Sequence, residues 1–428
     1  MGANISRRGV LAGASMAGVM ASMPALAKAG PGGFSPEGLK GVTTAMQAAI
    51  DRGDAAGVVT LLYRHGEIAQ VDAVGFQDEA ARTPMRRDTI FRIASMTKPI
   101  TAVATLMLIE EGKFGLSTPV EKILPELADR KLLASPTDPL DTARPSPHGI
   151  LVSDLLTHRS GIVTPDTAAG PLVEALKAAD KARETGPDEW IKRVGALPLA
   201  YEPGTRFNYG NSFDVLGVLV ARASGMALPD FLEARIFKPL GMKDTGFFVP
   251  ADKMARLAVN YGVDPQTRKR IVADPSGPAS RWAKPPAFPA GAGGLVSTAD
   301  DYLAFARMLL GKGRSGDVRL LSHETVALMT ANWLTPEQRR MPFSGLDFWS
   351  GQGFGLGVSV VDDVARQVRT PFGYSSAGSF GWPGAWGTWW QADPKEDMIQ
   401  IFLVQLPAAD PRTPVRAFQQ AGYKAIDD

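Results

Sequence analysis

Apolar residues with the spacing of β-strands occur near both ends of this chain, and helical spacing dominates between them. Residues 58–63 and 68–74 are two such runs, and the four residues Arg64-His65-Gly66-Glu67 that join them predict an antiparallel hairpin. Further strands are predicted at 354–361, 379–391 and 398–405. One sheet completed by both chain ends, with a helical portion inserted between them, explains this order.

The same periodicity predicts the helices. Residues 100–109 are apolar almost all round and stop at Gly112, which favours a helix buried on every side. The loop 135–149 is rich in Pro, Asp and Ser and is predicted to be exposed. An amphipathic helix is predicted at 36–52, and further helices are predicted at 216–223, 231–237, 298–311, 322–332 and 413–426.

The first residues have the features of an export signal rather than of a folded segment. Arg7-Arg8 precede an uncharged stretch of small and apolar residues from Gly9 to Met23, and Ala25-Leu26-Ala27 has the small-x-small pattern of a signal peptidase site. A paired arginine before a mild apolar segment is typical of a twin-arginine signal. We therefore expect residues 1–27 to direct export to the periplasm or outside the cell. The apolar run is too short for stable membrane insertion.

Charge and cysteine content exclude several classes of protein. The formal charge of +2 falls to 0 without Arg7 and Arg8, so the chain has no electrostatic reason to bind nucleic acid. The absence of cysteine excludes disulfides, thiolate zinc sites, a cysteine nucleophile and a lipoprotein anchor. No His and carboxylate cluster has metal-ligand spacing, so neither a metal nor another cofactor is expected. No sequence feature specifies an oligomeric state.

Ser95-Met96-Thr97-Lys98, at the head of the predicted buried helix, is the strongest local signal for chemistry. A serine and a lysine three residues apart share one helix face, so the amine can reach the hydroxyl. Pro99 is tolerated only near a helix start, which predicts that Ser95 lies in the first turn, beside unpaired N–H groups. That positive potential and partial desolvation favour a neutral amine, which lets Lys98 accept the serine proton.

Tyr209-Gly210-Asn211 supplies a second candidate group for proton transfer. A tyrosine near a lysine ammonium has its phenolate stabilised, so Tyr209 could carry a proton to the leaving atom. Asn211 is expected to hydrogen-bond Lys98 and a substrate carbonyl. His158 is expected to be structural. No Gly-x-Ser-x-Gly motif is present, which disfavours an α/β-hydrolase triad.

Taken in order along the chain, these motifs resemble those of the serine β-lactamase and penicillin-binding peptidase superfamily. The likeness is to its class C-type branch, which includes family VIII carboxylesterases. It extends over Phe91-Arg92-Ile93-Ala94, the stretch from Glu111 to Leu116, Leu155 to Gly161, and Gly291 to Thr298. The resemblance implies an α+β fold, a mainly antiparallel sheet flanked by helices with an inserted all-helical subdomain. It places the sheet subdomain at 34–90 plus 286–428 and the helical subdomain at 91–285, with the active site between them.

The third motif departs from that of a β-lactamase. Trp382-Pro383-Gly384 occupies the place where the family commonly has Lys-Thr-Gly, so the cation and the hydroxyl that meet a β-lactam carboxylate are absent. If the match holds, the resemblance implies that the Ala385 N–H joins the Ser95 N–H as the oxyanion hole. Four of the eight tryptophans lie between 382 and 390, which predicts an apolar rim for the acyl pocket, with sheet packing expected for Trp389 or Trp390.

The sequence therefore predicts an exported serine hydrolase that cleaves small-molecule carboxylic esters or amides, with esters favoured. The first alternative is a β-lactamase or D-alanyl-D-alanine carboxypeptidase that finds a substrate carboxylate through Arg92, Arg159 or Arg206. The second is a penicillin-binding sensor that is acylated without turnover.

Overall fold

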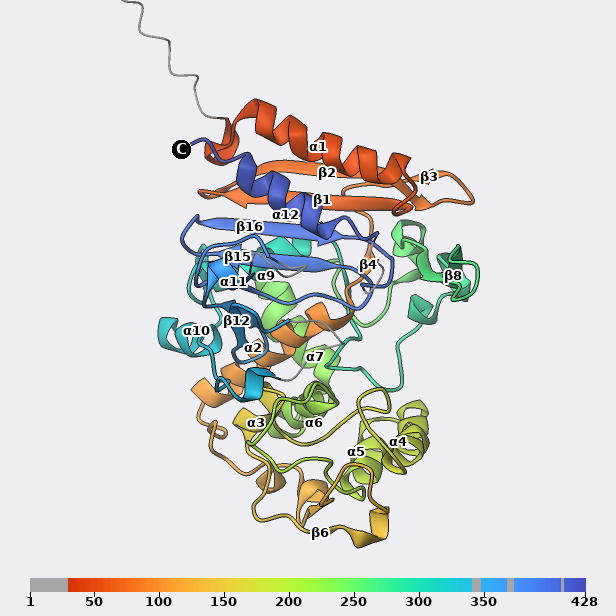
Figure 1. Cartoon of the computed structure of the whole chain (residues 1–428), viewed down its shortest axis with the longest axis vertical. Coiled ribbons are helices and arrows are strands. Elements are labelled where there is room, and N and C mark those ends of the chain that lie inside the picture. The colour runs from red at the N-terminus through yellow and green to blue at the C-terminus, as the bar shows by residue number, and fades with distance from the viewer. Residues whose placement is uncertain (1–29, 341–347, 368–372, 409–411) are drawn as a thin grey trace, which may run out of the picture.

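The computed structural model describes residues 30–340, 348–367, 373–408 and 412–428 of the 428-residue chain, so the predicted export signal lies outside the described residues. A single eight-stranded sheet of antiparallel neighbours crosses the molecule (Figure 1). Its strands, in spatial order, are β12 (Gln352–Phe354), β13 (Ser359–Val361), β14 (Phe380–Gly381), β15 (Trp389–Asp393), β16 (Met398–Leu403), β1 (Gly57–Arg64), β2 (Glu67–Asp78) and β3 (Thr83–Pro84). Strands from both chain ends complete it, as predicted.

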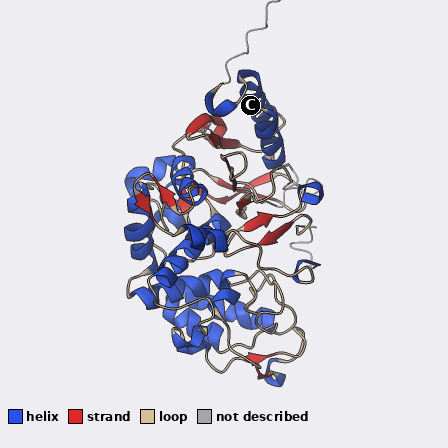
Figure 2. Cartoon of the chain, turned by 90° about the vertical axis from the view of Figure 1, so that its left-hand side faces the viewer, coloured by secondary structure: helices blue, strands red, loops and turns tan. Residues whose placement is uncertain are grey.

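Helices cover both faces of this sheet (Figure 2). On β1, Val58 and Leu62 pack under the terminal helices α1 (Pro36–Asp51) and α12 (Val415–Lys424). Val59 and Leu61 point the opposite way, into the main core that contains α9 (Ala299–Leu310). Both faces are apolar because both are buried, which is why β1 shows little of the usual polar alternation.

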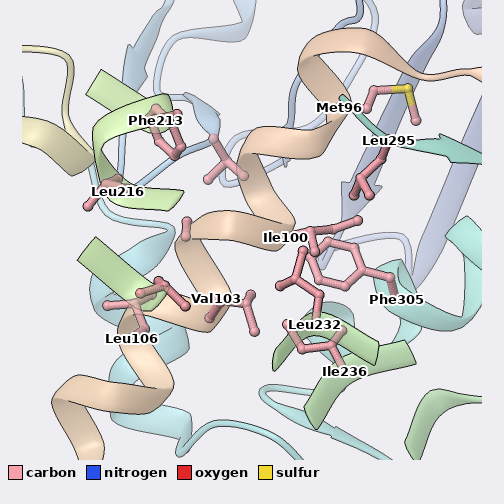
Figure 3. Packing of buried hydrophobic residues seen from close by; sticks show 14 of the residues in the cluster. Met96, Ile100, Val103, Leu106, Phe213, Leu216, Leu232, Ile236, Leu295 and Phe305 are labelled. Carbon is pink, nitrogen blue, oxygen red and sulfur yellow. The ribbon is translucent and has the colours of Figure 1, made fainter. Parts of the chain in front are cut away.

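The helical part lies below the sheet in Figure 1 and comprises α3 (Val152–Leu156), α4 (Leu172–Asp180), α5 (Pro187–Gly195), α6 (Ser212–Ser224) and α7 (Leu228–Leu232). Between it and the sheet runs α2 (Thr97–Glu110), whose residues from Thr97 to Leu108 are all buried. Ile100, Val103 and Leu106 pack among side chains of α6, α7 and α9 (Figure 3). Each such side chain contributes roughly 1.5–3 kcal/mol by burial, so α2 is a fixed platform for whatever its first turn carries.

The remaining elements are short. They are β4 (Phe91–Arg92) paired with β9 (Val296–Ser297), the hairpin β7 (Asn260–Val263) and β8 (Arg270–Asp274), the pairs β5 (Lys131–Leu132) with β6 (Arg144–Pro145) and β10 (Arg314–Ser315) with β11 (Val318–Arg319), and helices α8 (Lys238–Leu240), α10 (His323–Met329) and α11 (Val364–Gln367). Among the described residues, no single helix is long and apolar enough to span a membrane, although one pair bent by 78°, Ser212–Ser224 with Leu228–Leu240, passes that test together.

Two predicted strands are each divided in the structure. The run 354–361 turns back on itself at Gly357, whose φ of +90° favours glycine, and forms β12 and β13. The run 379–391 is interrupted after β14 because Pro383 has no N–H for the ladder and Gly387 turns at a φ of +79°. The predicted helix 231–237 continues from α7 as a π-helical turn, Glu233–Phe237. The subdomain boundaries proposed from the sequence stay a prediction.

Candidate active site

Ser95 lies on a 3₁₀ turn, Ala94–Met96, directly before α2 rather than in its first turn as predicted. The reason is Pro99, which cannot donate the α-helical hydrogen bond to the Ser95 carbonyl. The Thr97 N–H instead contacts the Ala94 and Ser95 carbonyls. Ala94 has a φ of +45°, an uncommon conformation for a residue with a side chain, and this turns the chain so that Ser95 stays partly exposed between buried neighbours.

Two side chains from separate elements converge on the Ser95 hydroxyl. The Lys98 Nζ lies 3.0 Å from Ser95 Oγ, and the Tyr209 hydroxyl lies 2.7 Å from it. The same amine is 4.5 Å from the centre of the Tyr209 ring and donates to the Ala292 carbonyl at 2.7 Å. Lys98 is only 3 % exposed. The structure thus brings together Ser95, Lys98 and Tyr209, the three residues predicted from the sequence. Ser95 and Tyr209 are 114 positions apart in the chain.

Tyr209 is backed by an aromatic cluster that includes Trp382. The indole Nε1 of Trp382 donates to the Tyr209 hydroxyl at 3.4 Å, and the indole is 1 % exposed. Trp382 therefore lies behind the phenol, enclosed by Phe348 and Phe354, and its predicted contact with substrate stays a prediction. Trp389 and Trp390 are buried in the sheet, as predicted. The hydrogen bond from Trp382 polarises the Tyr209 phenol, and the surrounding rings fix its orientation toward Ser95.

Asn211 has partners other than those predicted. Its Nδ2 donates to the Val163 carbonyl at 3.2 Å, and its Oδ1 accepts from Arg183 at 3.2 Å. The expected hydrogen bond to Lys98 is absent from the described residues. The reason is that the buried side-chain amide of Asn211 is already engaged, its Nδ2 by the Val163 carbonyl and its Oδ1 by Arg183. Asn211 therefore anchors the loop that carries Tyr209.

The third motif comes close to the nucleophile through its backbone. A Cβ at Gly384 would lie 2.4 Å from the Ile93 carbonyl and 2.1 Å from Thr388 Oγ1, so only glycine fits there. Ala385 follows on the exposed turn. In the part of the chain that the structure describes, neither the Ala385 N–H nor the Ser95 N–H donates a hydrogen bond. The predicted role of these two amides as the oxyanion hole stays a prediction.

The arginines considered as carboxylate anchors have protein partners. Arg92 is fully buried and ion-paired with Asp274, so it is not available to a substrate. Arg159 donates to Thr157 Oγ1 at 2.9 Å, and the Arg206 guanidinium lies 4.2 Å from the centre of the Tyr201 ring. Among the described residues, no group of three or more His, Asp and Glu side chains could hold a metal ion.

His158, predicted to be structural, is fully buried. Nothing in the sequence indicated that it packs directly against Tyr209, with ring centres 4.5 Å apart. Its Nδ1 accepts from the Gly210 N–H at 3.4 Å, and its Nε2 has no hydrogen-bond partner within the described residues. This contact could not be predicted from the spacing between His158 and Tyr209, because it does not lie within a single helix or strand pair.

Burial makes His158 a determinant of pH stability. Complete burial lowers the pKa of His158 well below 6.5, so the folded protein keeps it neutral. The unfolded chain takes up a proton below about pH 6.5. The free energy of unfolding therefore decreases as the pH falls below about 6.5, because the unfolded state binds one more proton than the folded state. The decrease is up to about 1.4 kcal/mol per pH unit.

We expect His158→Asn to show a shallower loss of unfolding free energy than the wild type between pH 7 and pH 5. Asparagine tolerates the left-handed backbone at this position, where φ is +54°, and does not titrate. Urea unfolding at each pH measures the difference, in which the other titrating groups cancel. Parallel curves for the two proteins would show that His158 ionises in the folded state.

Comparisons with known proteins identify the family to which the chain is similar. The family model described as Beta-lactamase matches residues 42–423. Protein Rv1367c of Mycobacterium tuberculosis is 44% identical, covering 86% of this chain and 90% of its own length. Esterase EstB of Burkholderia gladioli is 34% identical, covering 79% and 82%. The solved structure of EstCE1, a hydrolase with promiscuous acyltransferase activity, superposes with a TM-score of 0.75 at 26% identity, covering 92% of this chain and 99% of that one.

Proposed function

This chain belongs to the beta-lactamase family and is a serine hydrolase, and from that premise we propose that it cleaves carboxylic esters through an acyl-enzyme on Ser95. The observation that carries the proposal is the convergence of the Lys98 amine and the Tyr209 phenol on one partly exposed serine hydroxyl. Similarity to an esterase over most of both chains supports the substrate class.

In the proposed mechanism, Ser95 Oγ attacks the ester carbonyl carbon while Lys98 takes its proton, which then passes through Tyr209 toward the leaving group. The tetrahedral oxyanion accepts hydrogen bonds from the Ser95 and Ala385 N–H groups. Tyr209 then protonates the departing alcohol oxygen as the carbon–oxygen bond breaks. A water molecule then attacks the acyl carbon as the same pair takes one of its protons. The pair returns that proton to Ser95 Oγ as the bond between Oγ and the acyl carbon breaks and the carboxylic acid leaves.

The third motif favours esters over β-lactams. Trp382 stands where a lysine would meet the β-lactam carboxylate, and its indole is directed to Tyr209 instead. Arg92 is enclosed with Asp274, which removes one alternative anchor. A neutral ester needs no such anchor, because its carbonyl is bound by the two N–H groups alone.

We expect p-nitrophenyl butyrate to be hydrolysed with a kcat/KM about 30- to 150-fold above that for a chromogenic cephalosporin, because the loss of one charged contact is worth roughly 2–3 kcal/mol. Absorbance assays on one enzyme preparation measure both. Faster cephalosporin turnover would replace the esterase proposal with a β-lactamase. A stoichiometric burst with either substrate, followed by no turnover, would favour a penicillin-binding sensor.

We also propose that residues 1–27 export the protein by the twin-arginine pathway. The support is the order of the paired arginine, the apolar run and the cleavage pattern in the sequence. Fractionation of cells that express the wild type or the Arg7→Lys, Arg8→Lys variant tests this, and equal periplasmic yields would contradict it.

A further inference from the structure

The backbone of residues 290–295 passes beside Lys98 and is held at three points. Thr101 Oγ1 donates to the Gly291 carbonyl at 2.8 Å. The Leu295 N–H donates to Thr97 Oγ1 at 3.2 Å, and the Ala292 N–H donates to Asp214 Oδ1 at 2.9 Å. We call residues 290–295 the lysine strap, because its Ala292 carbonyl accepts the hydrogen bond from Lys98.

The strap lies directly against α6. A Cβ at Gly291 would be 2.5 Å from the Phe213 carbonyl and 3.2 Å from the Gly217 Cα. This close approach puts Asp214, in the first turn of α6, beside the Ala292 N–H. The Asp214 residue is 5 % exposed. The buried Asp214 oxygen accepts the hydrogen bond of the Ala292 N–H and so fixes the direction of that peptide unit.

We propose that Asp214 is a positioning residue for the catalytic lysine, acting through Ala292 and held in place by Arg183. This inference rests on the proposed function, in which Lys98 takes the serine proton. The connection is continuous: Asp214 fixes the Ala292 N–H, the Ala292 carbonyl fixes the Lys98 amine, and the amine lies 3.0 Å from Ser95 Oγ.

Arg183 completes the connection from the far side of Asp214. Its Nη2 donates to Asp214 Oδ2 at 2.8 Å and to Asn211 Oδ1 at 3.2 Å, and its Nε donates to Asp180 at 3.0 Å. The guanidinium is stacked on two aromatic rings, 4.6 Å from the centre of Trp190 and 4.4 Å from that of Phe288. One cation therefore orients both Asp214 and the asparagine of the tyrosine motif.

The lysine needs such support because its side chain has four rotatable carbon–carbon bonds. A proton acceptor that is displaced by about 1 Å can lose on the order of 100-fold in rate. Ser95 Oγ alone cannot hold the amine, since the serine oxygen must itself move toward the substrate. The Ala292 carbonyl is the second contact that fixes the direction of the amine.

The test compares three substitutions for p-nitrophenyl butyrate hydrolysis. We expect Asp214→Ala to lower kcat about 10- to 100-fold with KM changed less than about threefold, because Asp214 contacts no substrate. Asp214→Asn keeps an oxygen for the Ala292 N–H and should recover most of the lost kcat. Arg183→Ala should also lower kcat, because Arg183 orients both Asp214 and Asn211.

Asp244→Ala is the matched control. Asp244 is similarly buried and ion-paired with Arg256 at 2.5 Å, yet it takes no part in the strap, so its loss should leave kcat unchanged at a temperature where both variants are folded. Unchanged kcat in Asp214→Ala would overturn the inference. Equal defects in Asp214→Asn and Asp214→Ala would also overturn it, because the charge rather than the Ala292 contact would then matter.

The nucleophile is tested separately with a fluorophosphonate that labels serine hydrolases. Labelling of the wild type that is lost in Ser95→Ala supports the proposed function, and slower labelling of Asp214→Ala supports the inference. Labelling of Asp214→Ala at the wild-type rate overturns the inference and leaves the proposed function standing. A wild type that is not labelled overturns both.

Discussion

Ser95→Ala is expected to reduce kcat for p-nitrophenyl butyrate by at least about 10⁴-fold, because no other group can form the acyl-enzyme. The Lys98 amine and the Tyr209 phenol both contact this hydroxyl, so both lose the atom on which they act. What remains is binding and oxyanion stabilisation, which give only weak catalysis by bound water. Initial rates over a range of substrate concentrations measure the effect, and KM should change little.

Ser322→Ala provides the control for this experiment. Ser322 caps α10 through the Thr325 N–H and takes no part in the site, so its loss should cost about 1 kcal/mol of stability and no activity. Mass spectrometry of the wild type quenched during turnover should find the acyl group on the peptide that contains Ser95. If Ser95→Ala retained full turnover, the mechanism would have to be abandoned.

Asp274→Ala is expected to lower the free energy of unfolding by about 3–5 kcal/mol. Arg92, fully buried and three residues before Ser95, would keep its charge without the carboxylate that neutralises it. Burial already lowers the pKa of Arg92, although the Asp274 charge opposes that shift. The guanidinium would retain the Ala258 carbonyl at 2.6 Å and the Trp282 ring at 5.0 Å, neither of which carries a negative charge.

The matched comparison is Asp300→Ala, which breaks an exposed pair with Arg87 at 2.7 Å and should cost less than about 1 kcal/mol. Urea denaturation followed by tryptophan fluorescence measures both variants. Asp274→Asn should fall between them, since an amide still accepts a hydrogen bond from Arg92. Equal losses for Asp274→Ala and Asp300→Ala would show that Arg92 gains solvent or another partner when Asp274 is removed.

Most helices and strands could be predicted from the sequence because the spacing of their apolar residues matches the period of a helix or a strand. Apolar spacing identified the β1–β2 hairpin, the buried helix α2 and the terminal helices within a few residues. It erred where one glycine or proline reversed or interrupted a strand, as at Gly357 and Pro383. At these positions the apolar residues continue on both sides of the break, so their periodicity alone does not indicate a turn.

The catalytic candidates could be identified from local spacing, since Ser95 and Lys98 are three residues apart and Tyr209 belongs to a motif in the right order. The surroundings of these residues depend on tertiary packing. Trp382 lies behind Tyr209, Asn211 bonds Arg183, and Asp214 reaches Lys98 through Ala292. These contacts join segments far apart in the chain, and their geometry follows from how the sheet, α2 and α6 pack together. Local spacing fixes residues within a turn, whereas packing fixes distances between elements.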